Sequence, residues 1–212
     1  MDSVKSRKNK PAKNSLMNGL RPEESATVLR RLLAAHPDLE AEAENIAKSV
    51  LHEVDLESIA NEVEDAVRAL DYDDLNGRAG RHEWGYVEPG DAAMEILEET
   101  VEPFIEDLKR HIDLGLEADA LEVCKGLILG LYRLEHGENC TLMDWAPDFP
   151  SEAAGRALET WRDGGAAAAA KPSGAKGRRK RSAFPQEFVE EFVPEWSAMI
   201  ARILPRARKN RG

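Results

Sequence analysis

The chain has 212 residues, of which 42% are hydrophobic and only 6% aromatic, and its formal net charge is −11. A mean hydropathy of −0.50 and the lack of an apolar run of membrane-spanning length favour a soluble protein without membrane contact. Two cysteines do not make a disulfide framework, and no apolar stretch follows the basic N-terminus as it does in a secretory signal. We therefore expect a cytoplasmic location, or a nuclear one if the source is eukaryotic.

Charged residues are sorted into blocks along the chain. Residues 1–22 hold six basic residues and one acidic residue, and residues 164–212 hold eleven basic and four acidic residues. Residues 23–163 hold twelve basic and thirty-five acidic residues. This sorting makes the middle of the chain unsuited to phosphate and suited to a basic partner, whereas the two ends have the opposite preference.

Composition and periodicity divide the chain into four parts. We predict a disordered basic tail over 1–20, an acidic all-α domain over 21–163, a flexible basic linker over 164–183, and an amphipathic segment with a basic end over 184–212. Within the acidic domain, apolar residues recur at three- and four-residue steps, which predicts amphipathic helices. The first three expected helices cover residues 22–36, 38–54 and 55–70.

Residues 71–88 follow as the longest break, with Gly77, Gly80 and Gly85. The fourth expected helix covers about 89–113, and Pro103 inside it should kink or split it. The fifth, about 117–135, is apolar on more than one face and should be the most buried. A sixth starts at Ser151 and reaches Trp161, before a Gly- and Ala-rich run that is typical of a linker.

These elements predict an all-α fold, either a helical bundle or a short helical-repeat stack of five to six helices, with disordered basic termini. The repeat hypothesis rests on the match between residues 39–51 and 116–128, which begin Leu-Glu-Ala-Glu-Ala and Leu-Glu-Ala-Asp-Ala. The alternative is that any two helices rich in Glu, Ala and Leu match this well.

Two segments carry candidate partner-binding residues. In the loop, Arg78 and Arg81 lie close to Trp84 and Tyr86, and Arg and aromatic side chains are enriched at binding hot spots. In the alternative interpretation, the aromatic rings fold back on the helices and the arginines pair with nearby aspartates, namely Asp71, Asp73 and Asp74.

The second segment is C-terminal, where bulky residues recur every four positions. They are Phe184, Phe188, Phe192, Trp196 and Ile200. Such a stripe predicts a contact element, and Phe188, Phe192 and Trp196 are its candidate partner-binding residues. Docking on the chain itself and binding to a partner both agree with the pattern.

A dense basic cluster lies in the predicted linker. It consists of Lys176, Arg178, Arg179, Lys180 and Arg181. Clusters of this kind bind nucleic acid weakly or act as nuclear import signals, and the alternative is a linker that only adds solubility.

No motif for a metal or a cofactor survives inspection, so we expect neither. A calcium loop starting at Asp71 has Leu75 at its fifth position and His82 where a bidentate Glu is needed. A zinc site from His111, Cys124, His136 and Cys140 lacks the Cys-x-x-Cys pair that would anchor it.

The leading interpretation is a non-catalytic protein-interaction module, a scaffold or adaptor whose acidic helical surface binds a basic protein. The second is an accessory protein that binds nucleic acid through its basic tails. The third is a small enzyme with a site at loop 71–88, which would require Arg78, Arg81, His82 and acidic residues to converge in one pocket.

Overall fold

The computed structural model describes residues 16–51, 54–83, 85–137, 140–170 and 183–204. The chain divides into two compact units, an N-terminal unit over Met1–Leu51 and a C-terminal unit over His52–Gly212. The stretch 21–163, expected as one domain, therefore spans both units. The basic cluster 176–181 lies outside the described residues, as does most of the predicted N-terminal tail.

The N-terminal unit consists of short helices. Its elements are the 3-10 helix η1 (Leu16–Gly19), α1 (Pro22–Ala35), the 3-10 helix η2 (Pro37–Leu39) and α2 (Glu40–Leu51). Pro22 occupies the first turn of α1, where its missing N–H costs nothing, and the helix ends before Pro37, as predicted. The turn over Leu16–Gly19 differs from the expected disordered tail. None of the described residues of this unit is buried.

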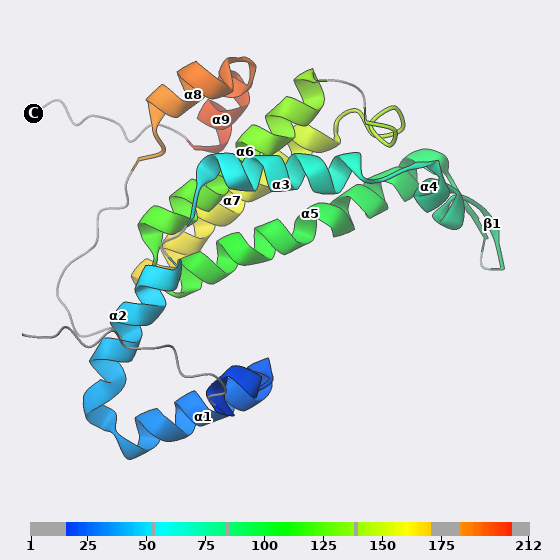
Figure 1. The fold of residues 1–212 in the computed structure, drawn as a ribbon. Coiled ribbons are helices and arrows are strands. Elements are labelled where there is room, and N and C mark those ends of the chain that lie inside the picture. Colours follow the sequence, from blue (N-terminus) through cyan, green and yellow to red (C-terminus); the bar gives the residue numbers. More distant parts are fainter. Residues whose placement is uncertain (1–15, 52–53, 84, 138–139, 171–182, 205–212) are drawn as a thin grey trace, which may run out of the picture. The chain divides into compact units, whose positions relative to one another are not determined.

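The C-terminal unit is mostly helical, which confirms the all-α class (Figure 1). Its helices are α3 (Leu56–Arg68), α4 (Tyr72–Arg78), α5 (Pro89–Asp113), α6 (Glu117–His136), α7 (Phe149–Ala170), α8 (Gln186–Phe192), the 3-10 helix η3 (Pro194–Trp196) and α9 (Ser197–Ile203). The sheet in the described part of the chain has two short strands, β1 (Gly80–His82) and β2 (Gly85–Val87).

The predicted break at 71–88 is in fact a short helix and a β-hairpin. Asp71 starts α4 by accepting hydrogen bonds from the backbone N–H groups of Asp73 and Asp74, and the Asp74 side chain accepts one from the Asp71 N–H in return. The strands that follow pair antiparallel, with Arg81 opposite Tyr86. The glycines predict a break here, whereas the hydrogen bonds between Asp71 and Asp74 start a helix.

Pro103 does not split α5, which continues over 25 residues. A proline inside a helix removes one backbone hydrogen bond to the carbonyl four residues earlier, here that of Glu99. Both Pro103 and Glu99 lie on the solvent side, so water can satisfy this carbonyl. Gly115, at φ +73°, then allows the reversal between α5 and α6.

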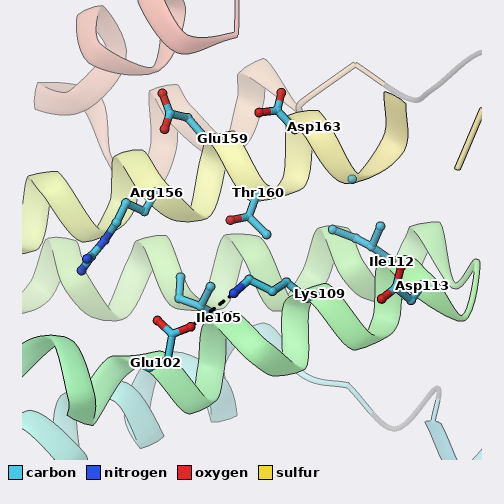
Figure 2. Close-up of a pocket in the computed structure, with 10 residues that line it drawn as sticks. Glu102, Ile105, Lys109, Ile112, Asp113, Arg156, Glu159, Thr160 and Asp163 are labelled. Carbon is cyan, nitrogen blue, oxygen red and sulfur yellow. Dashed lines mark hydrogen bonds and ion pairs between the residues drawn. The ribbon is translucent and has the colours of Figure 1, made fainter. Parts of the chain in front are cut away.

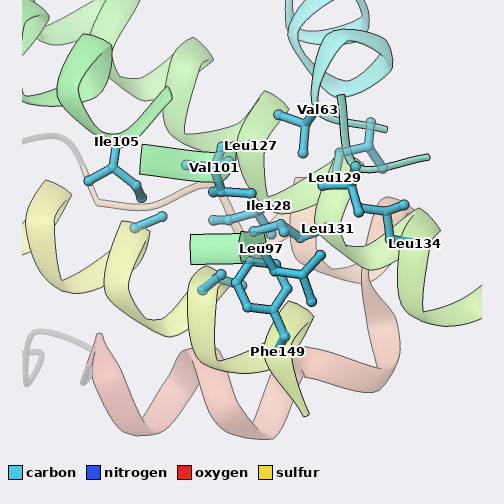
Figure 3. Packing of buried hydrophobic residues seen from close by; sticks show 14 of the residues in the cluster. Val63, Leu97, Val101, Ile105, Leu127, Ile128, Leu129, Leu131, Leu134 and Phe149 are labelled. Carbon is cyan, nitrogen blue, oxygen red and sulfur yellow. The ribbon is translucent and has the colours of Figure 1, made fainter. Parts of the chain in front are cut away.

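The core is centred on α6, which packs against α3, α5 and α7. Leu127 and Leu131 on α6 are fully buried, as is Phe149 at the start of α7 (Figure 3). The prediction that this helix is the most buried is confirmed, since buried side chains lie on several of its faces. Helix α7 extends beyond the expected end at Trp161, to Ala170, because alanine is the strongest helix former.

Two glycines allow α3 to lie directly against α6. A Cβ atom at Gly126 would lie 2.8 Å from the carbonyl oxygen of Leu56, and one at Gly130 would lie 2.7 Å from that of Ala60. Neither distance is tolerable for a real side chain. Arg133, further along α6, ties the same two helices together by donating to Glu57 at 2.7 Å and to Asn61 at 3.3 Å.

The C-terminal segment docks on its own chain. Trp196 is 5% exposed and donates its indole N–H to Glu135 of α6 at 2.6 Å, and the Tyr132 hydroxyl donates to Glu195. Phe188 is also buried, beneath the Lys125 ammonium at 5.8 Å from its ring centroid. The stripe predicted a contact element correctly, and the structure shows the contact within the chain.

We predict that Gly130→Ala lowers the free energy of unfolding by about 1–3 kcal/mol, because the added methyl group meets the Ala60 carbonyl and Val63. The matched control is Gly155→Ala on α7, where the new Cβ makes only an ordinary contact with Ile203 at 3.6 Å. That change should be neutral or stabilising by up to about 1 kcal/mol. Urea unfolding followed by circular dichroism compares the two, and equal midpoints would contradict the close approach.

Two tryptophans provide a test of the C-terminal docking. Trp196→Ala should lower stability by about 3–5 kcal/mol, because a buried aromatic side chain is removed. Trp145 is 46% exposed, so Trp145→Ala should cost about 1 kcal/mol or less. Both are measured by denaturant unfolding of the full chain. A Trp196 variant as stable as the Trp145 variant would show that the segment does not dock in solution.

Candidate functional site

An open groove of about 550 Å³ runs between α5 and α7. Figure 2 shows Glu102, Lys109 and Asp113 on α5, facing Arg156 and Thr160 on α7. The remaining lining residues are Ile105, Ile112, Glu159, Asp163 and Gly164. We call this feature the α5–α7 groove.

The helices approach each other closely at one end of the groove. A Cβ atom at Gly164 would lie 2.7 Å from a methyl carbon of Ile112, so a larger residue would require this isoleucine to move. Ile105 is 5% exposed and belongs to the core. The groove therefore has an apolar base, with charged side chains along its edges.

The two cations of the groove are already paired. Lys109 donates to Glu106 at 2.6 Å and to Glu102 at 3.2 Å, and Arg156 pairs with Glu98. The hydrogen bond to Glu106 raises the pKa of Lys109, and the same bond lowers the pKa of Glu106. Both groups are therefore charged at neutral pH.

Two carboxylates of the groove lack such a partner. Among the described residues, neither Asp113 nor Glu159 forms an ion pair at close range, although Arg162 senses the charge of Glu159. Arg162 itself is engaged by Asp163 at 2.7 Å, a hydrogen bond that raises its pKa. The side chains that line the groove thus carry a net negative charge, which favours the approach of a cation from outside.

The residues predicted as a binding site around the hairpin have different roles in the structure. Arg78 pairs with Glu99 and, at 3.5 Å, with Glu95 of α5, and its backbone carbonyl lies 2.7 Å from His82 Nε2. These partners are 17 and 21 residues away and are not the aspartates 71, 73 and 74 of the alternative interpretation. Arg78 thus anchors α4 and the hairpin to α5.

Arg81 and Tyr86 remain available at the hairpin. They are cross-strand neighbours, and Tyr86 is 64% exposed. Tyr72, on the adjoining α4, is 53% exposed. Trp84 lies outside the described residues. The structure brings Arg81 and Tyr86 together, and their partner-binding role stays a prediction.

The C-terminal candidates occupy a different place. Phe192 stacks on Phe188 with ring centroids 5.4 Å apart, and Trp196 meets Tyr132 edge-on at 5.3 Å. Their aromatic surface is used within the chain. A second role toward a partner stays a prediction.

The convergence required for an enzyme site is not seen among the described residues 71–83 and 85–88. Arg78 and His82 lie together, but Arg81 faces Tyr86, and the α5–α7 groove is lined by other elements. The sulfur and imidazole groups are likewise dispersed. Cys124 contacts the Ala157 carbonyl, Cys140 that of Val67, and His136 stacks on Tyr132. In the described part of the chain, no three His, Cys, Asp or Glu side chains are grouped to hold a metal ion.

The groove residues escaped the sequence analysis. Glu98 and Glu99, neighbouring acidic residues of α5, pair with arginines of α7 and α4, respectively. Only the packing of α5 against α7 brings the groove residues together, and no sequence motif signals it.

Comparison of the chain with protein-family models, with curated proteins and with solved structures finds no match. None of the helices in the described ranges has the length and apolarity to cross a membrane.

The Arg78–Glu99 anchor predicts a measurable titration. Hydrogen bonding to Arg78 holds the pKa of Glu99 below its ordinary value of 4.5, so the pair stabilises the fold above that value and loses its effect as pH falls through the folded-state pKa. Arg78→Gln should raise the Glu99 pKa, measured by carboxyl ¹³C NMR, whereas Arg81→Gln should leave it unchanged. An unaltered Glu99 pKa in the Arg78 variant would contradict the anchor.

Proposed function

We propose that the chain is a non-catalytic protein-interaction module that binds a basic protein at the α5–α7 groove. The observation that supports this most directly is the imbalance of charge there. Lys109 and Arg156 are neutralised by their own neighbours, while Asp113 and Glu159 face solvent without an ion-pair partner. Asp113 on α5 and Glu159 on α7 offer two separate contacts for basic side chains from outside, because the Glu159 carboxylate points away from α5 (Figure 2).

The surroundings of the groove favour the same class of partner. Over residues 54–163 the C-terminal unit holds 28 acidic and nine basic residues, which steers a basic protein toward it and repels phosphate. The apolar carbons of Ile105 and Ile112 at the base allow contact with the alkyl stems of Lys or Arg. Shape and charge thus fit an extended basic segment better than a small anion.

We further propose a bundle centred on α6, in preference to a repeat stack. The two matching segments of the sequence support this choice, because their corresponding positions differ in burial. Positions 123, 124 and 127 of α6 are buried, whereas the corresponding positions 46, 47 and 50 of α2 are exposed. Equivalent repeats would bury equivalent positions.

The proposal predicts which variants lose the partner. The full chain is immobilised and exposed to nuclease-treated native cell extract, and retained proteins are quantified by mass spectrometry. Asp113→Asn/Glu159→Gln should release one or a few basic proteins, with about tenfold weaker binding when a purified one is measured by calorimetry. The affinity of the unchanged chain should fall as salt is added.

Matched variants make the outcome specific. Glu62→Gln/Asp65→Asn removes two exposed charges from α3, outside the groove, and should retain the partner. Arg81→Ala/Tyr86→Ala tests the hairpin, and loss with this variant alone would move the site there. Identical retention by every variant, or retention of acidic proteins, would refute the proposal. Basic proteins that disappear only after nuclease treatment would instead support the nucleic-acid interpretation.

A further inference from the structure

The N-terminal unit leaves apolar side chains in solvent. On α1, Val28, Leu29 and Leu32 are 37%, 50% and 45% exposed, and on α2, Ile46 and Val50 are 57% and 64% exposed. The two helices have 14 and 12 residues. Helices of this length are marginal in water unless one face is packed, so this unit requires a surface that covers it.

The sequence of α2 independently indicates a face made for burial. It matches the first half of α6, and the residues matched by Ile46, Ala47 and Val50 are all buried. These are Val123, Cys124 and Leu127. The same pattern is thus packed in one unit and exposed in the other.

The charges on α1 identify the surface that fits. Glu23 and Glu24 lie in the first turn, and Arg30 and Arg31 follow seven residues later. In the described part of the chain none of these four forms an ion pair. Residues seven apart lie on the same side of a helix, so Glu24 and Arg31 border the same edge of the apolar face.

We propose that the chain self-associates through α1, which packs antiparallel on the α1 of a second copy. An antiparallel pair centred near Val28 and Leu29 buries these residues and Leu32 against their equivalents. It also brings Glu24 of each copy toward Arg31 of the other. In a parallel pair the equivalent edges lie on opposite sides of the contact, so Glu24 and Arg31 of the two copies do not face each other.

A second copy fits α1 better than the C-terminal unit does. Helix α1 carries two acidic and two basic residues, in an order complementary to its own reverse. The C-terminal unit is strongly acidic over 54–163, so contact with it would place Glu23 and Glu24 next to like charge. Two copies related by a two-fold axis form a closed, isologous contact, the commonest arrangement of soluble dimers.

Sedimentation equilibrium of the full chain tests the proposal. The unchanged chain should show a monomer–dimer equilibrium across the micromolar range, and Leu29→Asp should weaken it at least about a hundredfold, since two charges would be buried at the contact. The matched control is Leu114→Asp, at a leucine that is 53% exposed outside the N-terminal unit. It should leave the equilibrium unchanged.

A charge exchange separates a specific contact from a change in folding. Arg31→Glu alone and Glu24→Arg alone should each weaken the dimer about tenfold, by replacing two attractive pairs with two repulsive ones. The combined variant, or a mixture of the two single variants, should restore association. The Glu24 side chain also caps the Arg21 N–H at 2.9 Å, but the single and combined Glu24 variants both lack this cap, so their difference reports the charge pair.

Three results would overturn the proposal. The first is a monomer at every concentration, which would mean that another surface covers α1. The second is a dimer that Leu29→Asp does not weaken, which would place the contact elsewhere. The third is a combined variant no stronger than the single ones, which would exclude the antiparallel order. Circular dichroism of each variant confirms that helix content is preserved.

Discussion

The close approach of α3 to α6 is the constraint on which the C-terminal unit depends. Gly126 and Gly130 present bare backbone to the carbonyls of Leu56 and Ala60, so α3 covers one side of α6 without intervening side chains. The bulky residues of α6 then fill the space toward α5 and α7, where Leu127 and Leu131 are fully buried. With those helices fixed, the α5–α7 groove and the platform for α8 and α9 follow from packing.

Much of the fold could be predicted because helical periodicity is a local signal. The bounds of α1, α5 and α6 follow from proline, glycine and the apolar spacing. The hairpin anchor could not be predicted, since the Arg78–Glu99 pair joins residues 21 apart and many acids were equally available. The C-terminal stripe predicts that these side chains are buried. It does not predict against which surface they pack, because the hydrophobic effect is non-directional. Only the hydrogen bonds that Tyr132 and Glu135 of α6 make with the segment distinguish docking on the chain itself from binding to a partner.

The two units differ in the charged and apolar side chains that they expose. In the C-terminal unit, arginines tie neighbouring helices together at the surface, and the excess of carboxylates is left facing outward. Exposed pairs of this kind contribute little stability, so the fold depends mainly on the core. In the N-terminal unit, by contrast, the acidic and basic residues of α1 are equal in number, and its apolar face is exposed. If two copies pair through their N-terminal units, the dimer has two α5–α7 grooves, one on each C-terminal unit. Two grooves would increase the avidity for a repetitive partner.

The two thiols of the chain, Cys124 within α6 and Cys140 after its C-terminal end, contact different neighbouring helices. Cys124 faces α7 through the Ala157 carbonyl, and Cys140 faces α3 through that of Val67. Both are buried, so an alkylating reagent reaches either one only when the structure opens. Their relative rates of modification therefore distinguish an opening on the α3 side from one on the α7 side. The native chain thus carries its own pair of chemical reporters, one for each of these neighbouring helices.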